Sequence, residues 1–110
     1  MFIDTHCHLT DRHCGDGDAD RAIANAMAAG VGVMICPTAD PDDIPGALHI
    51  AHMHNNVFCT IGIHPEYINA NPDEYLTNDI LNDPRVVGVG EIGLDYHYNA
   101  DTRRQQIELF

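Results

Sequence analysis

The sequence predicts an α/β fold in which helices cover a parallel β-sheet. Short apolar segments begin at positions 2, 31, 57 and 86, so 26 to 29 residues separate successive starts. Between them lie segments whose apolar residues recur at helical spacing. Apolar strands that alternate with amphipathic helices are typical of βαβ units, because a parallel sheet needs a crossover between neighbouring strands.

The first two units carry clear start and stop signals. Asp18 is a typical N-cap residue, and Gly30 can adopt the left-handed conformation that ends a helix. Pro37 should end the strand before it, and Pro45 is tolerated in the first turn of the helix that follows. The elements expected here are a strand at 2–5, a helix from Asp18 to Gly30, a strand at 31–36, and a helix from about Asp43 to 55–56.

The last two units repeat this organisation. Asn71 followed by Pro72 reads as an N-cap and the first helical residue, and the pair Asp83-Pro84 should end that helix. The elements expected here are a strand at 57–63, a helix from Asn71 to about Asn82, a strand at 86–90, and a helix from about Asp101 to the last residue.

Four βα units can be arranged in two ways. A (β/α)₈ barrel takes about 250 residues, and the 110 residues here hold half of the required units. The final segment, 105–110, lies inside a helical pattern without a C-cap signal. The pattern therefore fits either a small open four-stranded sheet or the N-terminal half of a barrel.

The composition is that of an acidic globular chain. It has 17 acidic residues, five Arg and no Lys, and its formal net charge is −12. Such a chain has no basic stripe with which to hold nucleic acid by net charge. No apolar run approaches the roughly 20 residues of a membrane span, and the first residues do not look like a secretory signal. We therefore expect a cytoplasmic protein without a membrane partner, whose four cysteines are reduced.

Ionisable residues follow three of the expected strands. His6 and His8 follow the first strand, His64 the third and Glu91 the fourth. Functional groups of parallel α/β folds gather at the carboxyl ends of strands, so these residues should share one region. His6 and His8 are two residues apart in an extended segment, which puts both imidazoles on one face. Such a pair can bind a zinc-like ion, or it can be two hydrogen-bonded histidines without a metal.

Acidic residues near these histidines suggest how a site would be built. Glu91 ends an apolar strand, where a carboxylate needs either a metal ion or a salt bridge, for instance with Arg103 or Arg104. Asp4 shares the face of His6 and His8 and could orient an imidazole by accepting a hydrogen bond, and Asp95 could do the same near Glu91. A second H-x-H pair, His52 and His54, falls on an expected helix, where i and i+2 do not share a face.

These residues lie in three segments that resemble a known family. The segments are 2–9 (FIDTHCHL), 62–65 (GIHP) and 89–96 (VGEIGLDY). In this order and spacing they resemble the N-terminal half of the TatD family of metal-dependent deoxyribonucleases, over essentially all 110 residues. The resemblance implies a TIM-like (β/α) barrel, with residues 1–110 as the first four βα units of a single, incomplete barrel domain.

The resemblance also implies a metal centre and a reaction. His6 and His8 would hold the first of two divalent ions, and Glu91 would bridge both and act in catalysis; Zn²⁺, Mn²⁺ and Mg²⁺ all suit such ligands. His64 would contact the scissile phosphate or position the attacking water. The reaction would be hydrolysis of phosphodiester bonds in DNA, or in RNA, with 3′-5′ exonuclease character. The family's remaining ligands, two His and one Asp, belong to later strands, so the other half of the barrel is expected from the same chain or from another.

The sequence is also compatible with two alternatives. One is another metallohydrolase that begins with H-x-H, such as a cyclic amidohydrolase or a phosphoesterase. Many amidohydrolases bridge their metals with a carboxylated Lys, and the absence of Lys speaks against that type of centre in this chain. The other is a catalytically inert fragment, or a scaffold that only binds a partner half.

Overall fold

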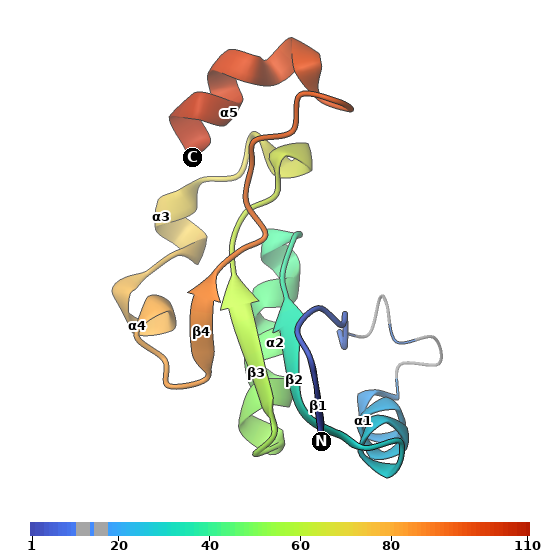
Figure 1. The fold of residues 1–110 in the computed structure, drawn as a ribbon. Helices are drawn as coiled ribbons and strands as arrows, with labels where there is room; N and C mark the ends of the chain where they lie inside the picture. The colour runs from blue at the N-terminus through green and yellow to red at the C-terminus, as the bar shows by residue number, and fades with distance from the viewer. Residues whose placement is uncertain (11–13, 15–17) are drawn as a thin grey trace.

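The centre of the molecule is a four-stranded parallel sheet (Figure 1). The computed structural model describes residues 1–10, 14 and 18–110. The strands lie side by side in the order β1-β2-β3-β4, without the reversal that marks a doubly wound sheet. Such a sequential order is that of successive units of a (β/α) barrel. The strands are β1 (Phe2–Asp4), β2 (Val31–Pro37), β3 (Val57–Ile61) and β4 (Val86–Val89).

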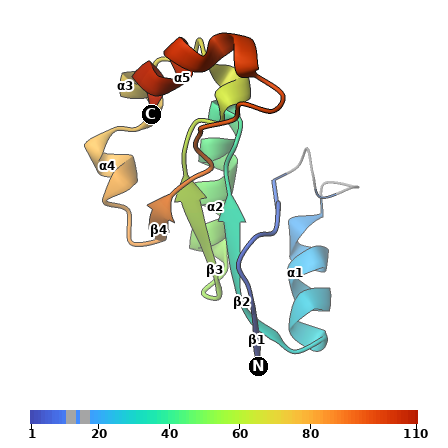
Figure 2. The same ribbon diagram turned by 45° about the horizontal axis from the view of Figure 1, so that its top comes forward.

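The helices follow the strands as the sequence predicts. α1 packs on β2, and α2 packs on β3 and runs alongside it in Figure 2. None of the helices in the described part of the chain is both long and apolar enough to cross a membrane. The helices are α1 (Ala19–Ala28), α2 (Ile44–Met53), α3 (Pro72–Tyr75), α4 (Asn78–Leu81) and α5 (Arg103–Leu109), with short 3₁₀ turns η1 (Pro41–Asp43), η2 (Pro65–Tyr67) and η3 (Ala100–Thr102).

The core lies between the sheet and these helices. Along β3 every second residue is fully buried, which is the period-2 pattern of a strand with one face against helices. Burying a side chain of the size of Ile or Val contributes about 1.5–3 kcal/mol. The core residues are Val57, Cys59 and Ile61 of β3, Met34 and Cys36 of β2, Ala19 and Ile23 of α1, Ile44, Ala47, Ile50 and Ala51 of α2, and Leu9 after β1.

The predicted capping residues act as expected. The side chain of Asp18 accepts a hydrogen bond of 2.8 Å from the main-chain N–H of Arg21 and so caps α1. Gly30 ends that helix with a φ of +93°, a conformation that favours glycine. Asn71 accepts from the main-chain N–H of Asp73 at 3.2 Å ahead of α3. These local interactions set where the chain turns back to the sheet.

The structure corrects the predicted helix from Asn71 to Asn82, which is two short helices. The first closes when the N–H of Leu76 donates to the carbonyl of Pro72 at 2.7 Å. A new helix then begins because the Thr77 side chain caps it, accepting from the N–H of Ile80 at 3.4 Å. A threonine inside a helical pattern can serve as a cap as well as continue the helix, and here capping prevails.

All four strand ends differ from the sequence-based expectation. β1 ends at Asp4 and not at residue 5. β2 continues through Pro37, which needs no N–H at the last position of a strand. β3 ends at Ile61 and not at residue 63, and β4 ends at Val89 and not at residue 90. After Gly90 the chain no longer pairs with β3, because the N–H of Glu91 donates to the carbonyl of Thr38, beyond the end of β2. The chain that leaves β4 therefore crosses over the end of β3.

Candidate metal centre

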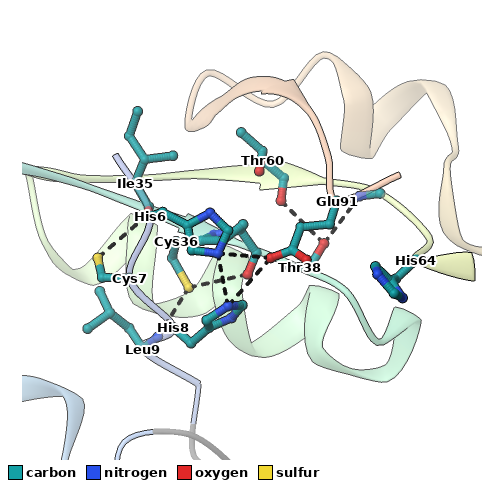
Figure 3. A network of polar contacts seen from close by, with 12 residues as sticks. His6, Cys7, His8, Leu9, Ile35, Cys36, Thr38, Thr60, His64 and Glu91 are labelled. Atoms are coloured by element: carbon teal, nitrogen blue, oxygen red, sulfur yellow. Dashed lines mark hydrogen bonds and ion pairs between the residues drawn. The ribbon is translucent and has the colours of Figure 1, made fainter. Parts of the chain in front are cut away.

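His6, His8 and Glu91 meet at the carboxyl ends of β1 and β4 (Figure 3). The Nε2 atoms of the two histidines are 3.2 Å apart. Oε1 of Glu91 lies 3.1 Å from Nε2 of His6 and 3.4 Å from Nε2 of His8. These three are the group of metal-ligating side chains found within the described residues, with one donor atom from each.

Main-chain pairing with β2 holds the two histidines on one face. The N–H of Cys7 donates to the carbonyl of Ile35 at 3.1 Å, and the N–H of Leu9 points to Sγ of Cys36 at 3.4 Å. The segment after β1 therefore stays extended beside β2, and alternate residues face opposite ways. Cys7 turns its Sγ to the carbonyl of Ile35, at 3.6 Å, and away from the imidazoles. Burial, and next the charge of Asp4, raises the pKa of the Cys7 thiol to about 12.

Glu91 reaches the histidines because the chain crosses over the end of β3. The N–H of Gly90 still donates to the carbonyl of Ile61 at 3.0 Å, as in a regular ladder. The next N–H, that of Glu91, donates to the carbonyl of Thr38 at 2.7 Å. The sequence at the end of β2 gives no functional signal, since Thr38 is not ionisable, yet this residue holds the main chain of Glu91.

The donor atoms of this group fit one divalent ion. Zn²⁺ binds nitrogen and oxygen at about 2.0–2.1 Å in tetrahedral sites, which puts neighbouring donors about 3.3–3.4 Å apart. The three observed separations, 3.1, 3.2 and 3.4 Å, are close to that spacing. Oε1 of Glu91 is buried and lacks a hydrogen-bond partner, although both imidazoles are within ion-pair distance. A buried oxygen left in this state is one that a cation would satisfy.

The group is open on one side. The side chain of His6 is 59% exposed and that of Glu91 is 27% exposed. Three protein ligands with a position open to water or substrate are typical of a catalytic metal site, whereas structural zinc sites are closed by four protein ligands. A metal-free pair between a protonated histidine and a glutamate at this exposure would contribute little to stability.

His64 lies near this group but outside it (Figure 3). It precedes η2, and its own main-chain N–H donates to the carbonyl of Ala39 at 3.0 Å. Its Nδ1 accepts from the main-chain N–H of Glu66 at 3.2 Å. Because Nδ1 accepts, the neutral ring carries its proton on Nε2, which leaves an N–H donor for another group.

Asp4 and Asp95 use their carboxylates on neighbouring donors. Asp4 accepts from the main-chain N–H of His6 at 3.1 Å. This bond fixes the main chain of His6, a candidate ligand, and does not involve its imidazole. Asp95 accepts from the N–H groups of Tyr98 and His97, at 3.1 and 2.9 Å, and these bonds, that of Tyr98 first, lower the pKa of Asp95. The orienting roles that the sequence suggests for these two residues stay predictions.

The second H-x-H pair serves a different purpose. His52 and His54 lie at the end of α2, where they contact two separate carboxylates. Nε2 of His52 is 2.8 Å from Asp83, and Nε2 of His54 is 2.9 Å from Asp20. The two rings thus tie the end of α2 to neighbouring elements, in keeping with the expectation that a helix does not bring i and i+2 together.

Comparison with known proteins agrees with the fold. The family model described as TatD related DNase matches residues 3–110. The uncharacterized metal-dependent hydrolase YjjV of Escherichia coli K12 is 36% identical over 98 residues, which are 86% of this chain and 38% of YjjV. The 3′-5′ ssDNA/RNA exonuclease TatD of Salmonella typhimurium is 32% identical over 97 residues, which are 84% of this chain and 36% of that protein.

Solved structures extend the agreement to three dimensions. The crystal structure of the TatD homologue YjjV from Escherichia coli K12 matches with a TM-score of 0.80 at 32% identity, over 98% of this chain and 43% of that one. A hydrolase of the TatD family from Entamoeba histolytica matches with a TM-score of 0.77 at 29% identity, over 98% and 42%. The chain spans about two fifths of the length of the relatives it matches. With its four parallel strands in sequential order it forms the first βα units of a TIM-type barrel, and it belongs to the TatD-related deoxyribonuclease family.

Proposed function

We propose that this chain supplies the first part of the metal centre of a phosphodiesterase that removes nucleotides from the 3′ ends of DNA or RNA. The observation that carries the proposal is the meeting of His6, His8 and Glu91 within 3.4 Å of one another, around a buried carboxylate oxygen that lacks a hydrogen bond. The name of the Salmonella relative, a 3′-5′ ssDNA/RNA exonuclease, supports the choice of substrate.

In this proposal His6, His8 and Glu91 bind the metal, and His64 binds the substrate. A divalent ion bound here would generate hydroxide near neutral pH and neutralise charge on the attacked phosphate. His6 and His8 offer neutral Nε2 lone pairs, and Glu91 offers a negative charge and a second carboxylate oxygen, so it is the residue suited to bridge two ions. His64 has its Nδ1 engaged by the N–H of Glu66, which leaves Nε2–H to donate to a phosphate oxygen.

The net charge of −12 is compatible with a polyanionic substrate in this proposal. Bound divalent ions are often the largest local charges in a site, and they can face a phosphate even where the protein surface is acidic. Zn²⁺, Mn²⁺ and Mg²⁺ remain the candidate metals, with two ions per site as the expected number.

We further propose that residues 1–110 are the N-terminal half of a single barrel domain. Both edge strands carry exposed apolar side chains, for example Phe2 at 71% and Val89 at 61%. Open strand edges of this kind are normally paired or covered. The later metal ligands would come from the other half, in the same chain or in a partner chain. A cytoplasmic location stays a prediction, to be checked by cell fractionation.

The test is a metal-dependent exonuclease assay on the intact protein. DNA and RNA labelled near the 3′ end are incubated with Mn²⁺, Mg²⁺ or Zn²⁺, and the Glu91→Gln variant is compared with Glu108→Gln, which changes an exposed glutamate paired with Arg104. We expect metal-dependent cleavage that Glu91→Gln reduces by at least about 100-fold and that Glu108→Gln leaves unchanged. The absence of cleavage by the wild-type protein, hydrolysis of cyclic amides instead, or full activity in Glu91→Gln would contradict the proposal.

A further inference from the structure

Thr38 is a buried polar residue at the carboxyl end of β2, with an exposure of only 1%. All of its hydrogen-bonding groups have partners. Its main-chain N–H and its hydroxyl both donate to the carbonyl of Thr60, at 3.1 and 3.2 Å. The hydroxyl also accepts from the N–H of Gly62 at 3.2 Å, and the Thr38 carbonyl accepts from the N–H of Glu91 at 2.7 Å.

These bonds join the ends of three strands at one residue. The hydroxyl of Thr38 fixes the chain that leaves β3, through one donor and one acceptor contact on Thr60 and Gly62. The carbonyl of the same residue fixes the chain that leaves β4 (Figure 3). Since the carboxylate of Glu91 is close to two imidazoles carried by the chain after β1, a shift of its main chain would move it away from both.

We propose that Thr38 is the positioning residue of the metal centre. Its hydroxyl holds the end of β3 against β2, and its carbonyl holds the main chain of Glu91 where the carboxylate meets His6 and His8. The inference rests on the proposed function, because Thr38 does not itself touch the ligand atoms. Its carbonyl fixes the main chain of Glu91 directly, and its hydroxyl fixes Gly62, against which the chain at Gly90 and Glu91 packs closely.

A purely structural role for Thr38 would have a different signature. Loss of a buried hydroxyl lowers the stability of any fold, so a drop in melting temperature alone supports neither interpretation. A positioning role changes the metal affinity of protein that is still folded. Groups that orient metal ligands typically change metal affinity by about 10- to 100-fold when they are removed.

The experiment measures Co²⁺ binding to the intact protein, by competition with a chromophoric chelator and by the visible absorption of the bound ion. Thr38→Val removes the hydroxyl at nearly constant volume, and Thr38→Ser keeps it. Thr60→Val is the matched control, because Thr60 contributes its main-chain carbonyl to the network, which the substitution leaves in place. All measurements are made well below the melting temperature of each variant.

We expect Thr38→Val to raise the Kd for Co²⁺ by about 10- to 100-fold and to alter the absorption spectrum, with both restored in Thr38→Ser and unchanged in Thr60→Val. A wild-type Kd and spectrum in folded Thr38→Val would overturn the inference. Should that variant not fold, Thr38→Ala takes its place, with a rise of at least tenfold expected and a wild-type Kd as the contrary result.

Glu91→Gln separates this inference from the proposed function. Weaker Co²⁺ binding in Glu91→Gln together with wild-type binding in Thr38→Val would overturn the role of Thr38 and support the proposed metal centre. Unchanged binding in Glu91→Gln would overturn the proposed metal centre, and with it any positioning role for Thr38.

Discussion

Gly62 lies at a close approach between two chain segments, and replacing it with alanine should disturb the metal centre from a position that carries no ligand. A Cβ at this residue would stand 2.6 Å from the carbonyl carbon of Gly90 and closer still to the carbonyl oxygen of Glu91. Ordinary van der Waals contact begins near 3.4 Å. The chain after β4 must therefore move by about 1 Å, and a displacement of that size in a site can lower activity about 100-fold.

The same clash should also cost stability. Forcing extra atoms into a packed region typically destabilises a protein by about 1–3 kcal/mol. Gly46→Ala is the control, since a Cβ at Gly46 would meet Cγ2 of Thr10 at an ordinary 3.7 Å on an exposed helical position. Alanine is favoured over glycine in a helix by about 0.5–1 kcal/mol, so this variant should be more stable than the wild type.

The two variants are compared by urea unfolding, by metal titration and by exonuclease activity of the intact protein. For Gly62→Ala we expect a loss of stability together with weaker metal binding and about 100-fold lower activity. Wild-type metal affinity and activity in Gly62→Ala would contradict this expectation, because the carboxylate of Glu91 would then tolerate the movement of its main chain.

Three further predictions concern stability and thiol reactivity. The hydrogen bond from His52, and next the N–H of Arg85, lowers the pKa of Asp83, so Asp83→Asn should cost about 1 kcal/mol or less at pH 7. The folded-state pKa lies below the unfolded one, so this contribution is present above about pH 4 and disappears as the pH falls further. Urea unfolding at pH 7 and pH 3 should show the difference shrink, and an equal difference at both would contradict the pairing. Burial raises the pKa of Cys7 and of Cys59 to about 12, so iodoacetamide at pH 8 should label both far more slowly in the folded than in the urea-unfolded protein, as read by mass spectrometry. Equal rates would show that these thiols are not buried. The buried side chain of Gln106 is hydrogen-bonded to the main-chain N–H and carbonyl of Asp95, both at 2.7 Å. Gln106→Leu should therefore lower the free energy of unfolding by about 1–3 kcal/mol, while Gln105→Leu, at an exposed neighbour, should not. Equal melting temperatures of the two variants would argue against these hydrogen bonds.

The order of the strands and the ionisable residues that follow them were predictable from the sequence because they depend on simple periodicities. A period of two puts His6 and His8 on one face, and the structure brings their Nε2 atoms to 3.2 Å. The alternation of strands and helices predicts the parallel sheet, and the carboxyl ends of parallel strands share one edge. That geometry puts Glu91 at the same edge as the two histidines, and the crossing of its chain over the end of β3 brings it to them.

Other features depend on main-chain hydrogen bonds that no residue pattern reveals. Thr38 contributes to the site through a carbonyl, which every residue has, and through a hydroxyl whose partners are main-chain groups. The break between α3 and α4 depends on Thr77, whose side chain can cap a helix or lie within one. In both cases the outcome is decided by which neighbouring N–H or carbonyl is within reach in the folded chain.

Anomalous X-ray scattering from crystals of the intact protein soaked with Mn²⁺ or Zn²⁺ would locate the ion itself. If His6, His8 and Glu91 hold the metal, the anomalous peak lies about 2.0–2.2 Å from Nε2 of both histidines and from Oε1 of Glu91. The peak should be lost in His6→Gln crystals and kept in His49→Gln crystals, since His49 is exposed on α2. A metal-dependent exonuclease whose crystals place the ion elsewhere, with no peak among these three side chains, would contradict the assignment.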